Sequence, residues 1–558
     1  MAASRTIWHC SARGAVAAAL AAALAPAAQA APPPRAGRPA PPPLLLPAPA
    51  AAAGSAGTWI VGGRPGAGTA ALAARFDATP LLDGAGVYAV RPGQARAFAA
   101  ALRAAGRLTF AEPDARGART RTAAPPNPWR AFPASALSPA DPLTGRQWWL
   151  RAVVRGPLAR PAVTAASPVL AVLDSQVDGR HPDIRGSNIR RDRPSVLDEE
   201  HGTAVTTAAA APDNGVGIVG IWPGMRVSLH TQPLTTAGIV SAFNAMIREH
   251  AAVANLSYGG GDSFAERVAQ NRAFAAGTLL VAAAGNEFEE GNPVEHPAGD
   301  PHVLTAAAVD RTLKSSYFSN ENDGIDLSAP GEGVLLGVPR AFDTEDGRRD
   351  GYTELDGTSF ASPIIAAAAT WVRAARPSLT TSQLFDVVRY SARDLGPKGW
   401  EPRYGYGLLD VRAALAEKAP PPDPGEPNDD VSWVDGTYIA AAAPVWTPGA
   451  APVSFAASLD QWEDPADVYR VVVPPGGQVT VTAKSSSGDA DLQLYASGAK
   501  TIYKNAGLLG TSKRRGSAAD TLTFRNTGAA PRTILAAAYI DSGVEQLDAN
   551  YTLSVRGG

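Results

Sequence analysis

The chain has 558 residues, of which 45% are hydrophobic and 18% charged, with a formal net charge of −2. This length and composition favour two to four domains around a large apolar core, and they exclude a chain that is disordered throughout. The near-neutral charge gives no basic field for nucleic acid, so no nucleic-acid partner is expected. The only cysteine, Cys10, lies in the leader described next, so the processed chain cannot be a disulfide scaffold or a cysteine protease.

Residues 1–30 have the pattern of a secretory signal peptide. Arg5 and Arg13 precede an apolar run over 15–25, and the small residues at 28–30 provide a cleavage site. A short membrane anchor is the alternative, but the run is too short to cross a bilayer. We therefore expect a secreted, extracellular protein with no membrane span.

The region before residue 141 contains one small folded unit between two linkers. Residues 31–57 form a Pro/Ala-rich linker, and 117–140 form a second linker that is rich in Arg and Pro and therefore a candidate for the maturation site. Between them, 58–116 show three short apolar runs and one helical stretch, the pattern of an α+β unit. The expected strands lie near 59–61, 87–90 and 108–110, and the expected helix over 94–105.

Residues 141–417 alternate short, continuously apolar runs with Ala-rich helical stretches. Continuous hydrophobicity indicates strands buried on both faces, so the pattern predicts a parallel sheet covered by helices, an α/β domain. Residues 418–431 read as a rigid acidic linker. Residues 432–558 show alternating hydrophobicity with many Gly and Ser turns, which predicts an all-β sandwich.

Three residues stand where an α/β sheet places its chemistry. Asp174 closes the apolar run 169–173, His201 begins an Ala-rich helical stretch, and Ser359 begins an apolar helix after a glycine. Each alone has an ordinary explanation, since Asp and Ser are common helix N-caps. Together they supply what acyl transfer needs: a serine nucleophile, a base with a near-neutral pKa, and an anion that orients the base.

Four motifs in this order resemble the subtilisin-like serine protease family: V-L-D-S-Q-V-D-G-R-H-P-D-I, H-G-T-A-V, A-A-A-G-N-E and G-T-S-F-A-S-P. The chain order Asp, His, Ser is also that of this family. The resemblance implies a doubly wound parallel sheet over 141–417 and a catalytic triad of Asp174, His201 and Ser359. It further implies that Asn286 supplies the side-chain amide of the oxyanion hole.

Two positions depart from the family pattern. Gln176 stands where the family usually has Gly, which puts the turn after Asp174 in doubt. Ala204 stands where the family usually has a second His. The alternative function is therefore a catalytically decayed subtilisin-fold binding protein, whereas a lipase or esterase lacks the G-x-S-x-G motif and the right residue order.

The resemblance also assigns a substrate groove. Ser257, Tyr258 and Gly259 would lie along the extended substrate backbone, and Ala283, Ala284 and Gly285 would wall the first specificity pocket. Glu295 resembles the residue at the pocket floor, where a carboxylate would favour Lys or Arg in the substrate; the alternative is a solvated acidic loop.

No cofactor is expected for the chemistry, but the resemblance allows a structural calcium ion. Asp183 and the loop containing Asn214 would be ligands and Gln147 could join them, with a plain surface turn as the alternative.

The flanking regions also match family patterns. The small unit 58–116 resembles an inhibitory propeptide, so the chain's own propeptide is an expected partner besides protein or peptide substrates. Residues 432–558 resemble the pre-peptidase C-terminal domain of secreted bacterial peptidases, with either a binding role or a stabilising one. The sequence thus predicts a secreted serine endopeptidase made as a zymogen.

Overall fold

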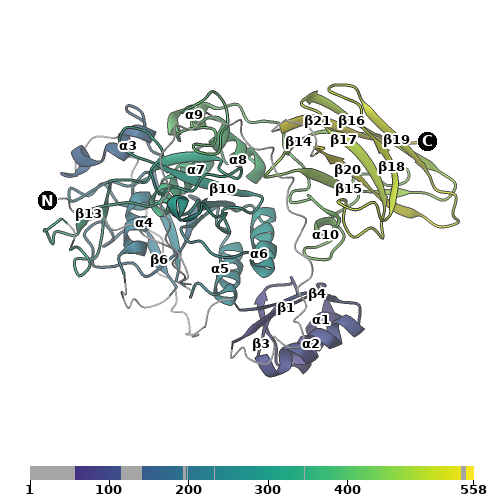
Figure 1. The fold of residues 1–558 in the computed structure, drawn as a ribbon, viewed down its shortest axis with the longest axis horizontal. Coiled ribbons are helices and arrows are strands. Elements are labelled where there is room, and N and C mark those ends of the chain that lie inside the picture. Colours follow the sequence, from purple (N-terminus) through teal and green to yellow (C-terminus); the bar gives the residue numbers. More distant parts are fainter. Residues whose placement is uncertain are drawn as a thin grey trace, which may run out of the picture.

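The computed structural model describes residues 57–114, 141–192, 197, 199–231, 233–344, 346–541 and 548–558 (Figure 1). The predicted signal peptide, nearly all of the first linker and the linker at 117–140 lie outside the described residues. Within the described residues, no helix combines the length and the hydrophobicity that crossing a membrane requires.

The N-terminal unit is a four-stranded antiparallel sheet, in the order β2-β3-β1-β4, with two helices on one face. Its elements are β1 (Trp59–Gly63), α1 (Ala67–Arg75), β2 (Thr79–Leu82), β3 (Val87–Val90), α2 (Pro92–Ala104) and β4 (Leu108–Pro113). Side chains alternate between the two faces of β1: Trp59 and Val61 pack under the helices with Phe98, whereas Ile60 faces the central domain. The sequence pattern did not predict α1 and β2.

The central domain is built on a seven-stranded sheet in the order β11-β10-β9-β8-β5-β7-β6, and every adjacent pair is parallel. The strands are β5 (Val169–Leu173), β6 (Ile189–Arg191), β7 (Arg226–His230), β8 (Val253–Leu256), β9 (Leu279–Ala283), β10 (Val303–Val309) and β11 (Leu327–Pro330). The predicted α/β doubly wound architecture is therefore confirmed.

Helices cover both faces of this sheet. One face carries α4 (His201–Ala210) and α7 (Thr358–Ala375), and the other carries α5 (Thr236–Arg248) and α6 (Phe264–Ala275). The strand order reverses between β5 and β8, so a crevice opens beyond their carboxyl ends. Asp174 follows β5 and Ser257 follows β8, which places both at this crevice. The remaining elements of the domain are α3 (Trp148–Val153), β12 (Val334–Gly337), β13 (Tyr352–Leu355), α8 (Thr381–Tyr390) and α9 (Val411–Ala416).

The C-terminal domain consists of two four-stranded antiparallel sheets, β14-β21-β16-β19 and β15-β20-β17-β18, packed face to face around a shared apolar core. Its elements are α10 (Val431–Val434), β14 (Val453–Asp460), β15 (Ala466–Val473), β16 (Gln478–Ser487), β17 (Asp491–Ala496), β18 (Leu508–Ser512), β19 (Asp520–Arg525), β20 (Arg532–Tyr539) and β21 (Asp548–Gly557). The predicted all-β sandwich is confirmed.

The acidic segment before this domain differs from the expected exposed linker. It has no helix or strand, but Asn428 is 1% exposed and Asp429 3%. The Val468 N–H donates to Asn428 Oδ1 at 2.6 Å, and the Ile502 N–H donates to Asp430 Oδ1 at 2.9 Å. These side chains satisfy backbone groups of the sandwich, so the segment belongs to the domain rather than separating it from the catalytic domain.

Candidate active site

Asp174 and His201 meet at the carboxyl edge of the sheet. Asp174 directly follows the fully buried β5, and His201 is the first residue of α4. His201 Nδ1 lies 2.8 Å from Asp174 Oδ1, and both residues are 6% exposed. Burial by itself lowers the pKa of His201, but the charge and hydrogen bond of Asp174, helped by Glu199 and Glu200, raise the pKa above the usual histidine value. This is the arrangement of a general base whose tautomer is fixed by a carboxylate.

Ser359 is the second residue of α7, whose N-cap is Gly357 with a φ of 156°. The Ser359 hydroxyl donates to the Ser257 carbonyl at 3.5 Å. The centroid of the His201 ring lies 5.6 Å from that of Phe360, the residue after Ser359, so α4 and α7 meet beside the serine. Backbone N–H groups in a first helical turn have no acceptor within the helix, and the helix dipole favours negative charge there. The Ser359 N–H is therefore suited to hold a developing oxyanion.

Pro363 lies inside α7 and removes the N–H that would bond to the Ser359 carbonyl. The Ser257 hydroxyl takes its place and donates to the Ser359 carbonyl at 2.8 Å. Asn255 in turn donates to the Ser257 hydroxyl at 2.9 Å. Ser257, predicted from the sequence as a groove residue, therefore also stabilises the backbone of the nucleophile.

Asn286 follows β9 at the same edge of the sheet and is 5% exposed. Its Oδ1 accepts hydrogen bonds from the Thr358 N–H and the Thr358 hydroxyl, both at 2.9 Å. These two bonds fix the amide with its oxygen toward Thr358, so the NH₂ group is directed to the other side. The Asn286 N–H donates to Glu287 Oε2 at 2.7 Å. Neither Thr358 nor Glu287 was assigned such a supporting role from the sequence.

The turn at Gln176 does not need glycine. Gln176 is absent from the described non-Gly residues with positive φ, which are Asp77, His250, Asn292, His302 and Leu313. Its amide donates to the Thr231 hydroxyl at 2.7 Å. Ala204 is fully buried in the core between α4 and the sheet. With Gln176 and Ala204 in place, His201 Nδ1 still lies 2.8 Å from Asp174 Oδ1.

A small pocket beside Ser359 brings most of the predicted substrate residues together. It is lined by Tyr258, Gly259, Ala283, Gly285, Asn286, Glu287, Glu295, Thr358 and Ser359. A methyl group built on Gly259 would lie 2.7 Å from Glu295 Oε2, and one on Gly285 would lie 2.9 Å from Glu295 Cγ. The Glu295 side chain thus occupies the space between two glycine walls. Ala284, in contrast, points into a buried cluster with Ala307 and Ile325.

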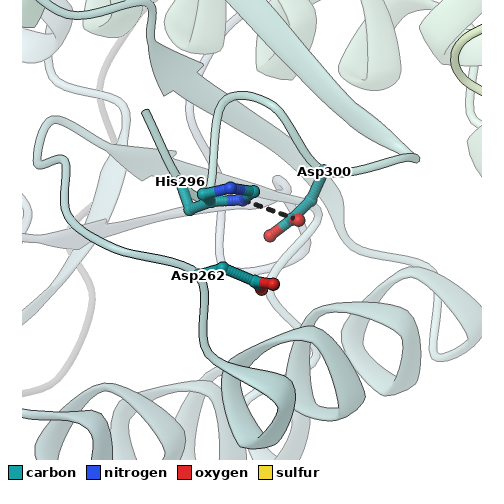
Figure 2. A group of neighbouring side chains, drawn as sticks. All are labelled: Asp262, His296 and Asp300. Atoms are coloured by element: carbon teal, nitrogen blue, oxygen red, sulfur yellow. Dashed lines mark hydrogen bonds and ion pairs between the residues drawn. The ribbon is translucent and has the colours of Figure 1, made fainter. Parts of the chain in front are cut away.

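An ion-pair network begins at His296, the residue that follows Glu295. His296 Nδ1 is 2.9 Å from Asp300 Oδ1, and Asp262 lies beside them at the start of α6 (Figure 2). These three residues could offer metal ligands, but the Arg267 guanidinium already lies among them, 2.7 Å from Asp262 and 3.2 Å from Asp300. The arginine neutralises the carboxylates, so the group is better explained as a structural support for the pocket wall.

A second buried acid supports the groove. The Tyr258 hydroxyl donates to Glu266 Oε1 at 2.7 Å. Burial raises the pKa of Glu266 to about 7. This side chain, on α6, was not identified from the sequence because nothing local marks it as buried.

The residues predicted to bind calcium carry oxygens that suit it. Asp183 is fully buried, and its Oδ1 has no hydrogen-bond partner in the described part of the chain; the same holds for Asp141 Oδ2. Burial raises the pKa of Asp183 to about 7 and that of Asp141 to about 6. Asn214 adjoins them, and Gln147 bonds to the backbone of Val219 through both amide atoms, at 2.8 and 3.0 Å. Two orphaned carboxylate oxygens fit a hard cation, and Gln147 Oε1, which accepts one of these bonds, keeps a second lone pair.

A further acidic cluster lies at the edge of the C-terminal domain. Ligand atoms of Asp423, Asp464 and Asp467 lie within 4.8 Å of one another. Among the described residues, one oxygen of each has no hydrogen-bond partner. Burial and mutual repulsion raise the pKa of Asp423 and Asp464 well above the usual range. These residues could also hold a divalent cation.

Residues 165–407 match the family model described as the subtilase family. Subtilisin DY of Bacillus licheniformis is 31% identical over 263 residues, which cover 45% of this chain and 91% of subtilisin DY. Fervidolysin of Fervidobacterium pennivorans is 30% identical over 319 residues, which cover 50% of this chain but only 45% of fervidolysin.

A crystal structure of fervidolysin, described as a keratinolytic enzyme related to subtilisin, matches with a TM-score of 0.53 and 20% identity. The match covers 84% of each chain and shows a shared fold. The sequence similarity to subtilisin DY spans nearly that whole protein. The chain therefore belongs to the subtilase family of serine proteases.

Proposed function

We propose that this protein is a secreted serine endopeptidase that is made as a zymogen and cleaves peptide bonds through an acyl-enzyme on Ser359. The observation that carries the proposal is the 2.8 Å contact between His201 and Asp174 beside the helix start that presents Ser359. The leader at 1–30 supports secretion.

The proposed chemistry uses the chain's own groups at every step. Ser359 Oγ attacks the peptide carbonyl while His201 Nε2 takes the hydroxyl proton, and Asp174 stabilises the resulting imidazolium. The Asn286 amide and the Ser359 N–H hold the oxyanion. His201 then gives the proton to the leaving amine, and a water activated by the same histidine hydrolyses the ester.

We propose a preference for Lys or Arg on the acyl side of the cleaved bond. Glu295 between Gly259 and Gly285 supports it, because a carboxylate in a narrow pocket stabilises a cationic side chain. Ser257, Tyr258 and Gly259 would pair with the substrate backbone.

Residues 58–114 are proposed to be the inhibitory propeptide, released by cleavage before residue 141. Their unit packs on α5 and α6 of the catalytic domain, which supports this role. A structural calcium ion is proposed at Asp183 and Asn214, with Gln147 and Asp141 as further ligands.

Casein hydrolysis by purified wild type beside Ser359→Ala, with the intact mass of both chains, tests the proposal. We expect wild type to digest casein and to lose its N-terminal residues, and the variant to do neither. If both chains are inert and keep the N-terminal region even after added trypsin, the endopeptidase proposal fails and a binding protein with a subtilisin fold is the better explanation.

A further inference from the structure

The N-terminal unit docks mainly on two helices of the catalytic domain. Glu112 accepts hydrogen bonds from the Ser263 hydroxyl at 2.8 Å and from the N–H groups of Phe264 and Ala265 at 3.0 and 3.2 Å, so it caps the start of α6. Ile60 and Phe110 join one apolar cluster with residues of α5 and α6. Charge at the helix ends and apolar burial therefore act together in this contact.

The same apolar cluster continues into the first residues of the C-terminal domain. Phe110 of the N-terminal unit lies 5.1 Å from Phe264, measured between ring centroids. Phe264 lies 5.0 Å from Tyr438, and Tyr438 lies 5.0 Å from Trp433. Four aromatic rings thus run without a break from the N-terminal unit across α6 to the segment that begins with α10. Figure 1 shows the N-terminal unit facing both α6 and α10.

A direct charge contact joins the two outer domains. The Arg64 guanidinium lies 3.7 Å from Asp435 Oδ2, and the two side chains are 35% and 20% exposed. An ion pair this accessible contributes little energy, so it serves mainly to orient the contact. The aromatic packing carries most of the attraction, because offset and edge-to-face ring pairs add to their apolar burial.

We propose that Trp433, Asp435 and Tyr438 form part of the propeptide-binding surface, so that the C-terminal domain helps to retain the N-terminal unit after the chain is cut. The occupant is the chain's own residues 57–114, which are seated on this surface in the structure. The inference rests on the proposed role of this unit as a propeptide. The C-terminal domain would then slow departure of the cleaved N-terminal unit and so take part in the timing of activation.

The test uses the full chain with Ser359→Ala, so that no step depends on its own activity. A recognition sequence for a sequence-specific protease is inserted between residues 115 and 140, the chain is cut there, and native mass spectrometry follows loss of the N-terminal fragment. We expect Tyr438→Ala to speed this loss about 10- to 100-fold, because it truncates a partly buried aromatic at an interface. Leu509→Ala, on the edge strand β18 of the sandwich, is the control and should change nothing.

A charge exchange covers the case in which Tyr438→Ala does not fold. Asp435→Lys should release the fragment a few-fold faster, and adding Arg64→Glu should restore the slow rate. Equal rates for folded Tyr438→Ala and the parent chain, or no rescue in the exchange, would overturn the inference. An inactive wild-type chain would refute the proposed protease function but would leave this measurement intact, because every chain in it lacks the nucleophile.

Discussion

The position of Glu295 allows a quantitative test of the proposed preference for Lys or Arg before the cleaved bond. The change is Glu295→Gln, which keeps the shape of the side chain and removes its charge. The carboxylate lies between Gly259 and Gly285 in a pocket that adjoins Ser359, so a bound Lys or Arg would meet it partly shielded from water. A hydrogen bond to a charged group in such a setting contributes about 1.5–3 kcal/mol, which corresponds to roughly a 10- to 150-fold effect.

The assay is kcat/KM on peptides that differ only in the residue before the scissile bond, Arg against Leu. We expect Glu295→Gln to lower the value for the Arg peptide about 10- to 150-fold and to leave that for the Leu peptide within about two-fold. Glu290→Gln, an exposed carboxylate of the same loop, is the matched control and should leave the Arg-to-Leu ratio unchanged. An unchanged ratio in Glu295→Gln would refute the assignment and leave Glu295 as a solvated loop residue.

Four further outcomes follow from the site. Asn286→Leu should lower kcat by about 10²–10³-fold with little change in KM, because one oxyanion donor is lost. Steady-state kinetics on a peptide ester measure both constants. A change in KM alone would contradict the role of Asn286 in the oxyanion hole. Ser257→Ala is made in the Ser359→Ala chain to prevent self-digestion. It should lower the free energy of unfolding in urea by about 1–3 kcal/mol, because the backbone carbonyl at position 359 loses its donor. An unchanged midpoint of urea unfolding would show that water replaces the hydroxyl. Because the pKa of His201 is raised, the histidine stays protonated and cannot act as a base until the pH exceeds the ordinary histidine range. A pH profile of kcat/KM should therefore fall as the pH decreases through that raised pKa. A fall that begins only below the ordinary histidine pKa would contradict the effect of Asp174. Removing calcium with a chelator should lower the melting temperature by about 5–10 °C relative to protein with calcium at about 100 times its Kd. The Asp183→Asn variant should lose most of that difference. Equal melting temperatures of wild type with and without calcium would exclude calcium at this site.

Several features of this protein could be predicted from local sequence. Strand β5 was evident as the apolar run 169–173, because a strand buried on both faces must be continuously apolar over a few residues. Asp174, His201 and Ser359 were proposed as a triad because they stand at strand and helix ends and match short family motifs, and the 2.8 Å contact between His201 Nδ1 and Asp174 Oδ1 supports the proposal. The period-2 pattern of the C-terminal region likewise predicted a sandwich.

Other features depended on contacts between distant residues. The acidic segment near Asn428 looked like a linker because charged and Pro-rich stretches are usually solvated, yet it is buried by strands that begin almost forty residues later. Gln147 was expected as a calcium ligand, and the structure adds that its amide also bonds to the backbone of Val219, in a part of the chain far away in sequence.

The sequence by itself determined the family and the layered α/β domain, because these depend on periodicity and on short motifs. Only the tertiary structure decided that Ser257 replaces the hydrogen bond lost at Pro363, and that Tyr438 packs edge-on against Phe264 beside the N-terminal unit. The physical reason is that burial and hydrogen-bond partners are properties of surfaces brought together from separate parts of the chain, and no single stretch of sequence contains both sides of the contact.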